Sequence, residues 1–377
     1  MNIDRHRVTP VYQYSTLTAA EQVRLAAGAI SGGDVATFGA RHLPEVERRV
    51  AARAGRAGAV AVDSGSAALA LAVRALGVRA GQEVVIPEVG WVSIGTAAAQ
   101  TGATVRVAPV DRTLMPTWEQ LAPLVGPATG AVVLAHLRGR PAPDIARIAA
   151  ELDEREIPLI EDGAQAWGVT VGGRPAGGWG TVAAFSAQTY KMIAVGEGGF
   201  LLADDLDLLS FVRAVAGDTR VPTPEAVWRG KQRMTEVSAA LALPQLDHLD
   251  ALTADLRCLQ RWLVERLLTV EGVSEIIPRT ARDIEDGNGS LTGMWLPTSD
   301  TARRLASDYW RAGLRCWWPG PGDLHTAGAW PVRPARSMVE IHSYLDLQTP
   351  WLPSEHHSSF ADHVAAVTTR TLCEVAV

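Results

Sequence analysis

Two residues of this sequence stand out for the chemistry that their side chains perform, and Lys191 is the first. It is one of only two lysines in 377 residues, although lysine and arginine together number 35 and lysine is normally among the commonest amino acids. It follows an apolar stretch and precedes the glycine-rich turn 196–199. Burial there would lower the pKa of its ammonium group and yield a free amine, which attacks carbonyl groups. Taken alone, Lys191 has an equally plausible structural interpretation, in which its aliphatic chain packs in the core and its ammonium group reaches solvent.

Asp162 is the second of these residues. It ends the predicted strand 158–162, and a carboxylate at the carboxyl end of a parallel strand faces the crevice in which α/β sheets bind ligands. There it would keep a pyridinium nitrogen protonated, as the chemistry of pyridoxal 5'-phosphate (PLP) requires. Capping the segment that begins at Gly163 is its alternative role.

A turn of small residues, Ser64-Gly65-Ser66, joins the predicted strand 59–62 to the predicted helix 67–76. The backbone N–H groups and the helix dipole at such a turn favour a phosphate group. An ordinary loop with a capping serine has the same sequence, so the turn by itself permits both interpretations.

Two further residues add to the predicted site. Ser186 precedes Lys191 by five residues and supplies another hydroxyl group. Trp91 follows a predicted strand and carries a ring that would stack on a flat ligand, although a core tryptophan is equally consistent with its position.

The elements that must position these residues are short apolar runs alternating with amphipathic segments. This alternation is typical of βαβ units around a mainly parallel sheet, and therefore predicts an α/β fold. The predicted strands are 59–62, 84–86, 104–109, 131–135 and 158–162, and the predicted helices are 67–76, 92–100 and 145–155.

The pattern changes after about residue 233. A long run of helically spaced leucines predicts a helix over 244–268, with Pro244 in its first turn. The shorter elements after it indicate a smaller α+β domain, so we expect a large domain over 1–245 and a small domain over 246–377. The predicted elements of the small domain are strands 274–277, 292–296 and 315–318 and helices 301–312 and 360–375.

Composition excludes several classes of protein. A formal net charge of −6 and a pI of 5.9 argue against a nucleic-acid-binding protein. No apolar run approaches the roughly 18 residues of a membrane span, and residues 1–14 show no secretory signal. Cys258, Cys316 and Cys373 have neither disulfide nor metal spacing. We therefore expect a cytoplasmic protein without a metal site.

In combination, the motifs make this chain similar to the DegT/DnrJ/StrS family of PLP-dependent sugar and cyclitol aminotransferases, which have fold type I. The resemblance runs from about residue 47 to 248, and more loosely to the C-terminus. The motifs that carry it are Ser64-Gly65-Ser66-Ala67-Ala68-Leu69, Gly81-Gln82-Glu83-Val84-Val85-Ile86-Pro87, His136-Leu137-Arg138-Gly139, Glu161-Asp162-Gly163-Ala164-Gln165-Ala166, Phe185-Ser186 with Lys191, Gly196-Glu197-Gly198-Gly199 and Arg233-Met234-Thr235-Glu236.

The resemblance implies a role for each predicted site residue. Lys191 matches the lysine that binds the cofactor covalently and later moves the proton between substrate and cofactor. Asp162 matches the carboxylate on the pyridine nitrogen, and Gln165 the residue near the phenolic oxygen. The residues that match phosphate-binding or ring-stacking positions are Gly65, Ser66, Ser186 and Trp91.

The resemblance also implies a homodimer in which each active site is completed by the partner chain. Lys231 stands where the family usually has an asparagine that reaches the partner's phosphate, and an ammonium group would serve as a point charge there. An exposed lysine beside Arg229 is the alternative. The segment 87–91 lacks the small hydroxyl residues typical of the family, which predicts an acceptor pocket unlike the usual sugar pocket.

The function implied is the transfer of an amino group from an amino acid, L-glutamate or L-glutamine, to a keto group of a small cyclic acceptor in secondary metabolism. The dehydratase branch of the family has histidine at the position of Lys191 and is therefore disfavoured. A family member with other PLP chemistry, or a non-catalytic PLP-binding regulator, is the alternative.

Overall fold

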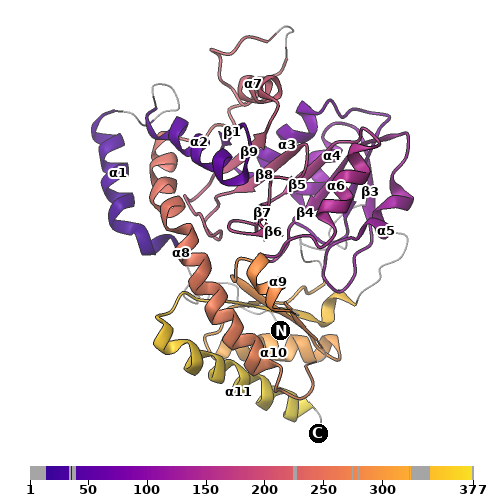
Figure 1. Cartoon of the computed structure of the whole chain (residues 1–377), viewed down its shortest axis with the longest axis vertical. Coiled ribbons are helices and arrows are strands. Elements are labelled where there is room, and N and C mark those ends of the chain that lie inside the picture. The colour runs from indigo at the N-terminus through magenta and orange to yellow at the C-terminus, as the bar shows by residue number, and fades with distance from the viewer. Residues whose placement is uncertain are drawn as a thin grey trace.

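Figure 1 shows the computed structural model of the chain, which describes residues 14–33, 35, 40–223, 227–273, 275–278, 280–321, 323 and 340–375. A larger α/β part lies above a smaller α+β part in this view, and the long helix α8 runs from one to the other.

The larger part is built on a seven-stranded sheet in the order β1-β9-β8-β5-β4-β2-β3. The neighbouring strands β8, β5, β4, β2 and β3 run parallel, whereas β9 is antiparallel to both of its neighbours, β1 and β8. The prediction of a mainly parallel sheet is confirmed. The strands are β1 Gly58–Val62, β2 Glu83–Pro87, β3 Thr104–Ala108, β4 Thr129–Ala135, β5 Leu159–Asp162, β8 Val182–Ser186 and β9 Gly199–Ala203.

Helices cover both faces of this sheet (Figure 1), and each face has its own apolar core. Because successive side chains of a strand point to opposite faces, Val60 and Val62 of β1 lie in one core and Ala59 and Ala61 in the other. The helices of this part are η1 Tyr14–Thr18, α1 Ala19–Ser31, α2 His42–Ala54, α3 Gly65–Ala75, α4 Ser93–Ala99, α5 Trp118–Leu121, η2 Ala122–Leu124, α6 Ile145–Asp153 and α7 Leu206–Val215.

Every strand and helix predicted up to residue 162 is present, with bounds that differ by a few residues. The turn-rich stretch that follows β5 holds a two-stranded hairpin, β6 Thr170–Val171 and β7 Arg174–Pro175.

The smaller part contains an antiparallel sheet of four strands, ordered β10-β11-β13-β12. The predicted α+β character of this part is confirmed, and β13 is an additional strand. Residue 274, the predicted first residue of a strand, lies outside the described residues. The elements are β10 Glu275–Ile277, α9 Ala281–Asp286, β11 Leu291–Trp295, α10 Ser299–Arg311, β12 Cys316–Trp317, η4 Ile341–Ser343, β13 Tyr344–Gln348, η5 Ser354–His356 and α11 His357–Val375.

The predicted start of the long helix at Pro244 is wrong. Helix α8 spans Glu236–Leu267, begins at the N-cap Thr235 and contains Pro244 in its interior. Proline inside a helix leaves the carbonyl four residues earlier without its usual donor, but the residues around Pro244 are buried against the large sheet. This tertiary packing outweighs the local signal. The predicted boundary between residues 245 and 246 falls inside α8 and stays a prediction.

The described part of the chain contains no helix that is both long and apolar enough to cross a membrane. It also contains no group of three or more histidine, cysteine, aspartate and glutamate side chains arranged to share a metal ion. All three cysteines are unpaired.

Candidate active site

A cavity of about 620 Å³ lies at the carboxyl ends of β4, β5 and β8, and residues of the smaller sheet also line it. This is the position at which open α/β sheets bind their ligands, and the volume suits a cofactor with a small substrate. Except for Lys231, the cavity brings together every predicted site residue: Gly65, Ser66, Trp91, Asp162, Gln165, Ser186 and Lys191.

Lys191 lies in the loop between β8 and β9, where its main-chain N–H donates to the carbonyl of Gln188 at 2.9 Å. Desolvation lowers the pKa of Lys191 to about 8, against the opposing effect of the Asp162 carboxylate, and the charge of Arg138 lowers it further. The side chain therefore supplies an amine that is much more easily deprotonated than that of an ordinary lysine.

Gln245 fixes the loop that carries Lys191. Its Oε1 accepts the N–H of Ala194 at 2.7 Å, and its Nε2 donates to the carbonyl of Ala194 at 2.9 Å and to that of Leu241 at 2.8 Å. Only 4% of Gln245 is exposed. Sequence reasoning missed this residue, although a glutamine among the leucines on the buried side of a long helix is a visible signal.

Asp162 ends β5, as predicted, and is buried. Its Oδ1 accepts the N–H of Ala164 at 2.9 Å, so the capping role and the position in the cavity occur together. Burial raises the pKa of Asp162, while the Ala164 N–H and the Lys191 charge oppose that rise. A cation near this carboxylate would be stabilised in turn.

Glu161, the residue before Asp162, has a different environment because adjacent strand residues point to opposite faces of the sheet. Its Oε1 accepts the N–H groups of Trp179 and Gly180 at 2.6 Å each, and its Oε2 accepts the N–H of Gly177 at 2.8 Å. His136 Nε2 lies 2.9 Å from Oε2. Glu161 therefore holds the loop after β7 against β5.

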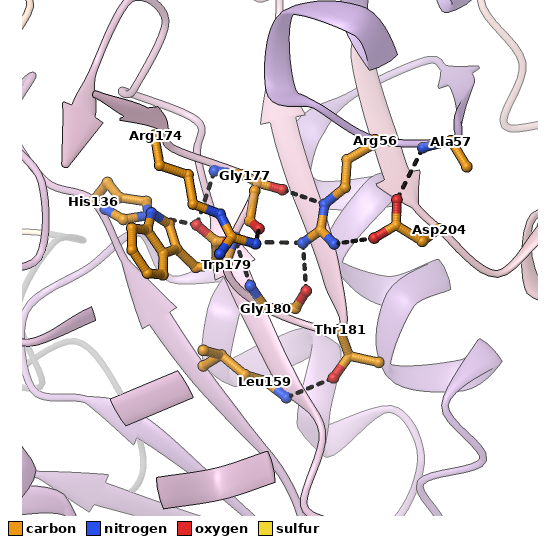
Figure 2. A network of polar contacts seen from close by, with 12 residues as sticks. Arg56, Ala57, His136, Leu159, Arg174, Gly177, Trp179, Gly180, Thr181 and Asp204 are labelled. Carbon is orange, nitrogen blue, oxygen red and sulfur yellow. Dashed lines mark hydrogen bonds and ion pairs between the residues drawn. The ribbon is translucent and has the colours of Figure 1, made fainter. Parts of the chain in front are cut away.

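The rest of this network is shown in Figure 2. His136 Nδ1 accepts the N–H of Ala142 at 3.0 Å, which places the ring hydrogen on Nε2, toward the glutamate. Arg56 donates from Nε to the carbonyl of Gly177 at 2.7 Å and pairs with Asp204 at 2.8 Å. The network joins β4, β5 and the segment before β1, and its His136 is also part of the cavity lining.

The N-terminus of α3 forms one wall of the cavity. Ser64 caps this helix by accepting an N–H of its first turn at 3.1 Å. A Cβ at Gly65 would stand 2.8 Å from the Cβ of Ser186, and a Cβ at Gly199 would collide with the main chain of Ser64. The two glycines therefore let the strand ends reach the helix, which gathers the Ser66 and Ser186 hydroxyls at a positive helix terminus.

Gln165 and Trp91 also line the cavity. Gln165 Oε1 accepts the main-chain N–H of Arg138 at 2.7 Å. Its amide nitrogen bonds to none of the described residues, so it remains available to an acceptor in the cavity. Trp91 has 40% of its surface exposed.

Lys231 is the predicted site residue that the structure does not bring into this cavity. It is exposed and lies in the segment after α7, outside the described lining of the cavity. Any contact of Lys231 with a cofactor therefore requires the cavity of a second chain.

The lining of the cavity also includes residues that were not predicted as site residues, among them Arg138, Trp317 and Asp346. The Arg138 guanidinium lies 3.5 Å from the centre of the Trp317 ring, and its Nε is 3.1 Å from Asp346 Oδ2. Arg138 belongs to a motif that carried the resemblance, but the other two lie in the smaller sheet, far along the chain. Nothing in the sequence around them indicates that they meet Arg138.

The fold and the cavity are those of an α/β protein with a lysine of lowered pKa at the carboxyl edge of its parallel strands. The family model described as the DegT/DnrJ/EryC1/StrS aminotransferase family matches residues 18–304. The chain belongs to this aminotransferase family, which confirms the family and the enzyme class predicted from the sequence.

Solved structures agree with this fold over almost the whole chain. The structure of 3-amino-5-hydroxybenzoic acid synthase is 24% identical, with a TM-score of 0.82, and covers 93% of this chain and 97% of its own. The aminotransferase TlmJ from Streptoalloteichus hindustanus is 23% identical, with a TM-score of 0.84 and coverage of 95% and 97%. DesI, solved in the presence of its TDP-sugar product, is 26% identical, with a TM-score of 0.80 and coverage of 95% and 92%.

Proposed function

We propose that this protein is a PLP-dependent aminotransferase that moves an amino group from L-glutamate or L-glutamine to a keto group of a small cyclic acceptor, such as a cyclitol or keto-sugar. Family membership supplies the reaction type. The observation that carries the proposal is the position of Lys191, whose lowered pKa and place beside Asp162 suit an amine that reacts with carbonyl groups.

The chemistry of the cavity wall fits the groups of PLP. The helix terminus and its hydroxyls suit the phosphate, a buried carboxylate suits a protonated pyridine nitrogen, and a free amide N–H suits the phenolic oxygen. When bound, PLP supplies the electron sink for the reaction. The residues that would hold it are Gly65, Ser66 and Ser186 at the phosphate, Asp162 at the nitrogen, Gln165 at the oxygen, Trp91 at the ring and Lys191 at the carbonyl carbon.

Lys191 is also the group that moves the proton. With the cofactor bound, its amine would take the proton from the α-carbon of the amino donor and give it back on the other side of the transferred nitrogen, and the same group would serve the acceptor in reverse. A pKa of about 8 lies close to the working pH, where general acid–base catalysis is most effective. Gln245 holds the loop so that the amine stays in place.

Asp162 acts by accepting a hydrogen bond from the ring nitrogen and keeping the proton there. Its own Oδ1 is fixed by Ala164, so the carboxylate has one orientation before any ligand binds. Residues of the smaller sheet, including Trp317, complete the cavity and exclude water from the reacting atoms.

We propose further that the enzyme is a cytoplasmic homodimer with shared active sites, that Lys231 reaches the phosphate in the partner's cavity, and that the product enters antibiotic or other secondary-metabolite biosynthesis. The segment that carries Lys231 supports the dimer, because Trp228 in it is 70% exposed and exposed tryptophans are enriched at protein interfaces. The TDP-sugar product named for DesI supports a cyclic acceptor.

The experiment that tests the proposal is a donor half-reaction. Purified protein with PLP is expected to lose the absorbance of the aldehyde form when L-glutamate or L-glutamine is added, and D-glutamate is the control. Borohydride reduction followed by peptide mass spectrometry should place the cofactor on Lys191. A protein that binds PLP but converts it with no amino acid would instead be a PLP-binding regulator, and a reduced adduct on Lys191→Ala protein would contradict the assignment of the lysine.

A further inference from the structure

One wall of the cavity is an ion pair between the two parts of the molecule. Arg138 follows β4 of the large sheet, and Asp346 lies in β13 of the small sheet, with Nε and Oδ2 3.1 Å apart. Asp346 has no exposed surface and Arg138 only 7%. Both residues line the cavity that also contains Lys191, so any molecule that reacts there passes close to this pair.

The arginine is fixed by contacts other than the ion pair. Its backbone has a φ of 59°, and its N–H is bound by Gln165 at 2.7 Å. Its guanidinium group stacks at 3.5 Å from the centre of the Trp317 ring, and the indole Nε1 of Trp317 donates to Asp323 at 3.0 Å. Arg138 is therefore preorganised whether or not a ligand is present.

The hydrogen bonding of this pair is incomplete. Among the described residues, Arg138 Nη2 has no hydrogen-bond acceptor, and no side chain other than Arg138 bonds to the Asp346 carboxylate, which otherwise has the backbone N–H of Trp317 and the charge of Arg140 nearby. Buried polar atoms are nearly always hydrogen-bonded, and a buried ion pair is stable only when further hydrogen bonds satisfy its remaining atoms. Arg138 can therefore still donate a hydrogen bond and Asp346 can still accept one, and a molecule in the cavity could form both.

A hydroxyl group has the hydrogen-bonding properties that this pair requires. A guanidinium only donates and a carboxylate only accepts, whereas a hydroxyl does both, so one hydroxyl can accept from Arg138 Nη2 and donate to Asp346. The pair has no net charge. The pair therefore gives neither a carboxylate nor an ammonium on the acceptor ring a net electrostatic attraction.

We propose that Arg138 and Asp346 bind a hydroxyl group on the ring of the keto acceptor. The enzyme then selects hydroxylated, uncharged rings over rings that carry a carboxylate. This inference rests on the function proposed above, because it requires the acceptor to enter the cavity of Lys191. In this proposal the two residues bind the acceptor, and Lys191 moves the proton.

The test is an acceptor half-reaction with protein loaded with pyridoxamine phosphate. The probes are cyclohexanone, its 2-, 3- and 4-hydroxy derivatives, and 3- and 4-oxocyclohexanecarboxylate, and the return of the aldehyde-form absorbance is measured. We expect at least one hydroxylated ring to exceed cyclohexanone in kcat/KM by about 10- to 100-fold, the usual range for a hydrogen bond to a charged group. The carboxylated rings should fall below cyclohexanone.

Variants assign the preference to the pair. In Asp346→Ala and Arg138→Leu, the ratio of kcat/KM between the hydroxylated ring and cyclohexanone, both measured on the same variant, should fall toward one, mainly through KM. Asp346→Asn should retain part of the preference, because its amide oxygen still accepts a hydrogen bond. The matched controls are Arg106→Ala and Glu83→Ala, which break an arginine–carboxylate pair with a 2.9 Å contact outside the described lining of the cavity.

A second measurement needs no turnover. Titration calorimetry of myo-inositol, an unreactive polyol ring, should show binding to the wild type that weakens by the same factor in Asp346→Ala. The inference is overturned if the carboxylated rings are preferred, if the preference survives in both variants, or if myo-inositol binds the variant as well as the wild type. Failure of the donor half-reaction would overturn the proposed function, and the calorimetry would still decide the role of the pair.

Discussion

Two carboxylates with no exposed surface, Glu161 and Asp346, have opposite environments. Glu161 accepts hydrogen bonds from three backbone N–H groups and pairs with His136. Asp346 has one ion pair, with Arg138 Nε, and a backbone N–H of Trp317 nearby, but no other side chain among the described residues bonds to it. The first carboxylate is part of the scaffold, and the second lies on the wall of a cavity.

The pKa values of the two groups reflect this difference. Burial raises the pKa of Glu161, but the hydrogen bonds from His136 and the backbone outweigh burial, so that the pKa is lower than usual. Burial raises the pKa of Asp346 to about 6, and the charges of Arg138 and Arg140 only partly oppose this effect. A buried carboxylate whose oxygens all accept hydrogen bonds therefore has a structural role. One that lacks such partners and lies at a cavity marks a place where a ligand can bind.

The largest effect should come from Lys191→Ala, on the cavity side of this comparison. Removing the general acid and base is expected to reduce transamination by about 100- to 10,000-fold, with little effect on unfolding, because no side chain of the scaffold network is changed. Single-turnover spectroscopy and thermal unfolding measure the two quantities. Partial rescue of the rate by added methylamine would show that the missing group is an amine, and a rate close to that of the wild type would contradict its role.

Glu161→Ala should have the largest effect on stability. The substitution leaves His136 and three backbone N–H groups buried without their acceptor, and breaking such a buried network costs roughly 3–5 kcal/mol. Urea unfolding measures this loss, and Glu161→Gln should lie between the variant and the wild type. A loss of less than about 1 kcal/mol, the usual value for a surface ion pair, would contradict the distinction between the two carboxylates.

Asp346→Asn should behave in the opposite way. The pKa of Asp346 rises from 3.8 to about 6 on folding, so between these two pH values the folded protein keeps a proton that the unfolded chain has released. The stability of the wild type relative to Asp346→Asn therefore falls as the pH rises through this window, by at most about 3 kcal/mol. Urea unfolding at pH 4, 5, 6 and 7 measures the difference. A variant less stable than the wild type at pH 7 would refute the unsatisfied state of Asp346.

The cavity contains most of the site residues predicted from the sequence, and their roles stay predictions. Lys191, Asp162, Gln165 and Ser186 stand next to strand ends or inside local motifs, and the carboxyl ends of parallel strands meet at one edge of the sheet. Local patterns of this kind therefore determine which residues come together. The predicted mainly parallel sheet and smaller α+β part follow from the same short-range alternation.

The pairing of Arg138 with Asp346 was not predictable from the sequence, because it depends on contacts between distant segments of the chain. Asp346 lies on β13, and only the packing of the small sheet against the large one brings it to Arg138. Pro244 illustrates the same limit, since its local preference for a helix start was outweighed by burial of the whole of α8. Lys231 depends on a second chain, and its role stays a proposal.

The smallest of the expected effects belongs to Gln245, which joins the scaffold to the cavity. Gln245→Ala removes the hydrogen bonds to both main-chain groups of Ala194, at a cost of about 1–3 kcal/mol for the buried groups left unpaired. The loop of Lys191 then loses its fixed position. Because a small displacement of a catalytic group slows its reaction, we expect a slower donor half-reaction. The loss of rate should be smaller than in Lys191→Ala. Urea unfolding and stopped-flow spectroscopy measure both, with Gln260→Ala as control, since that buried glutamine of α8 bonds instead to Leu291 in the small sheet at 2.7 Å. If the Gln245 variant loses stability and keeps the full rate, the glutamine belongs to the scaffold alone, and the position of Lys191 must be set by the rest of its loop.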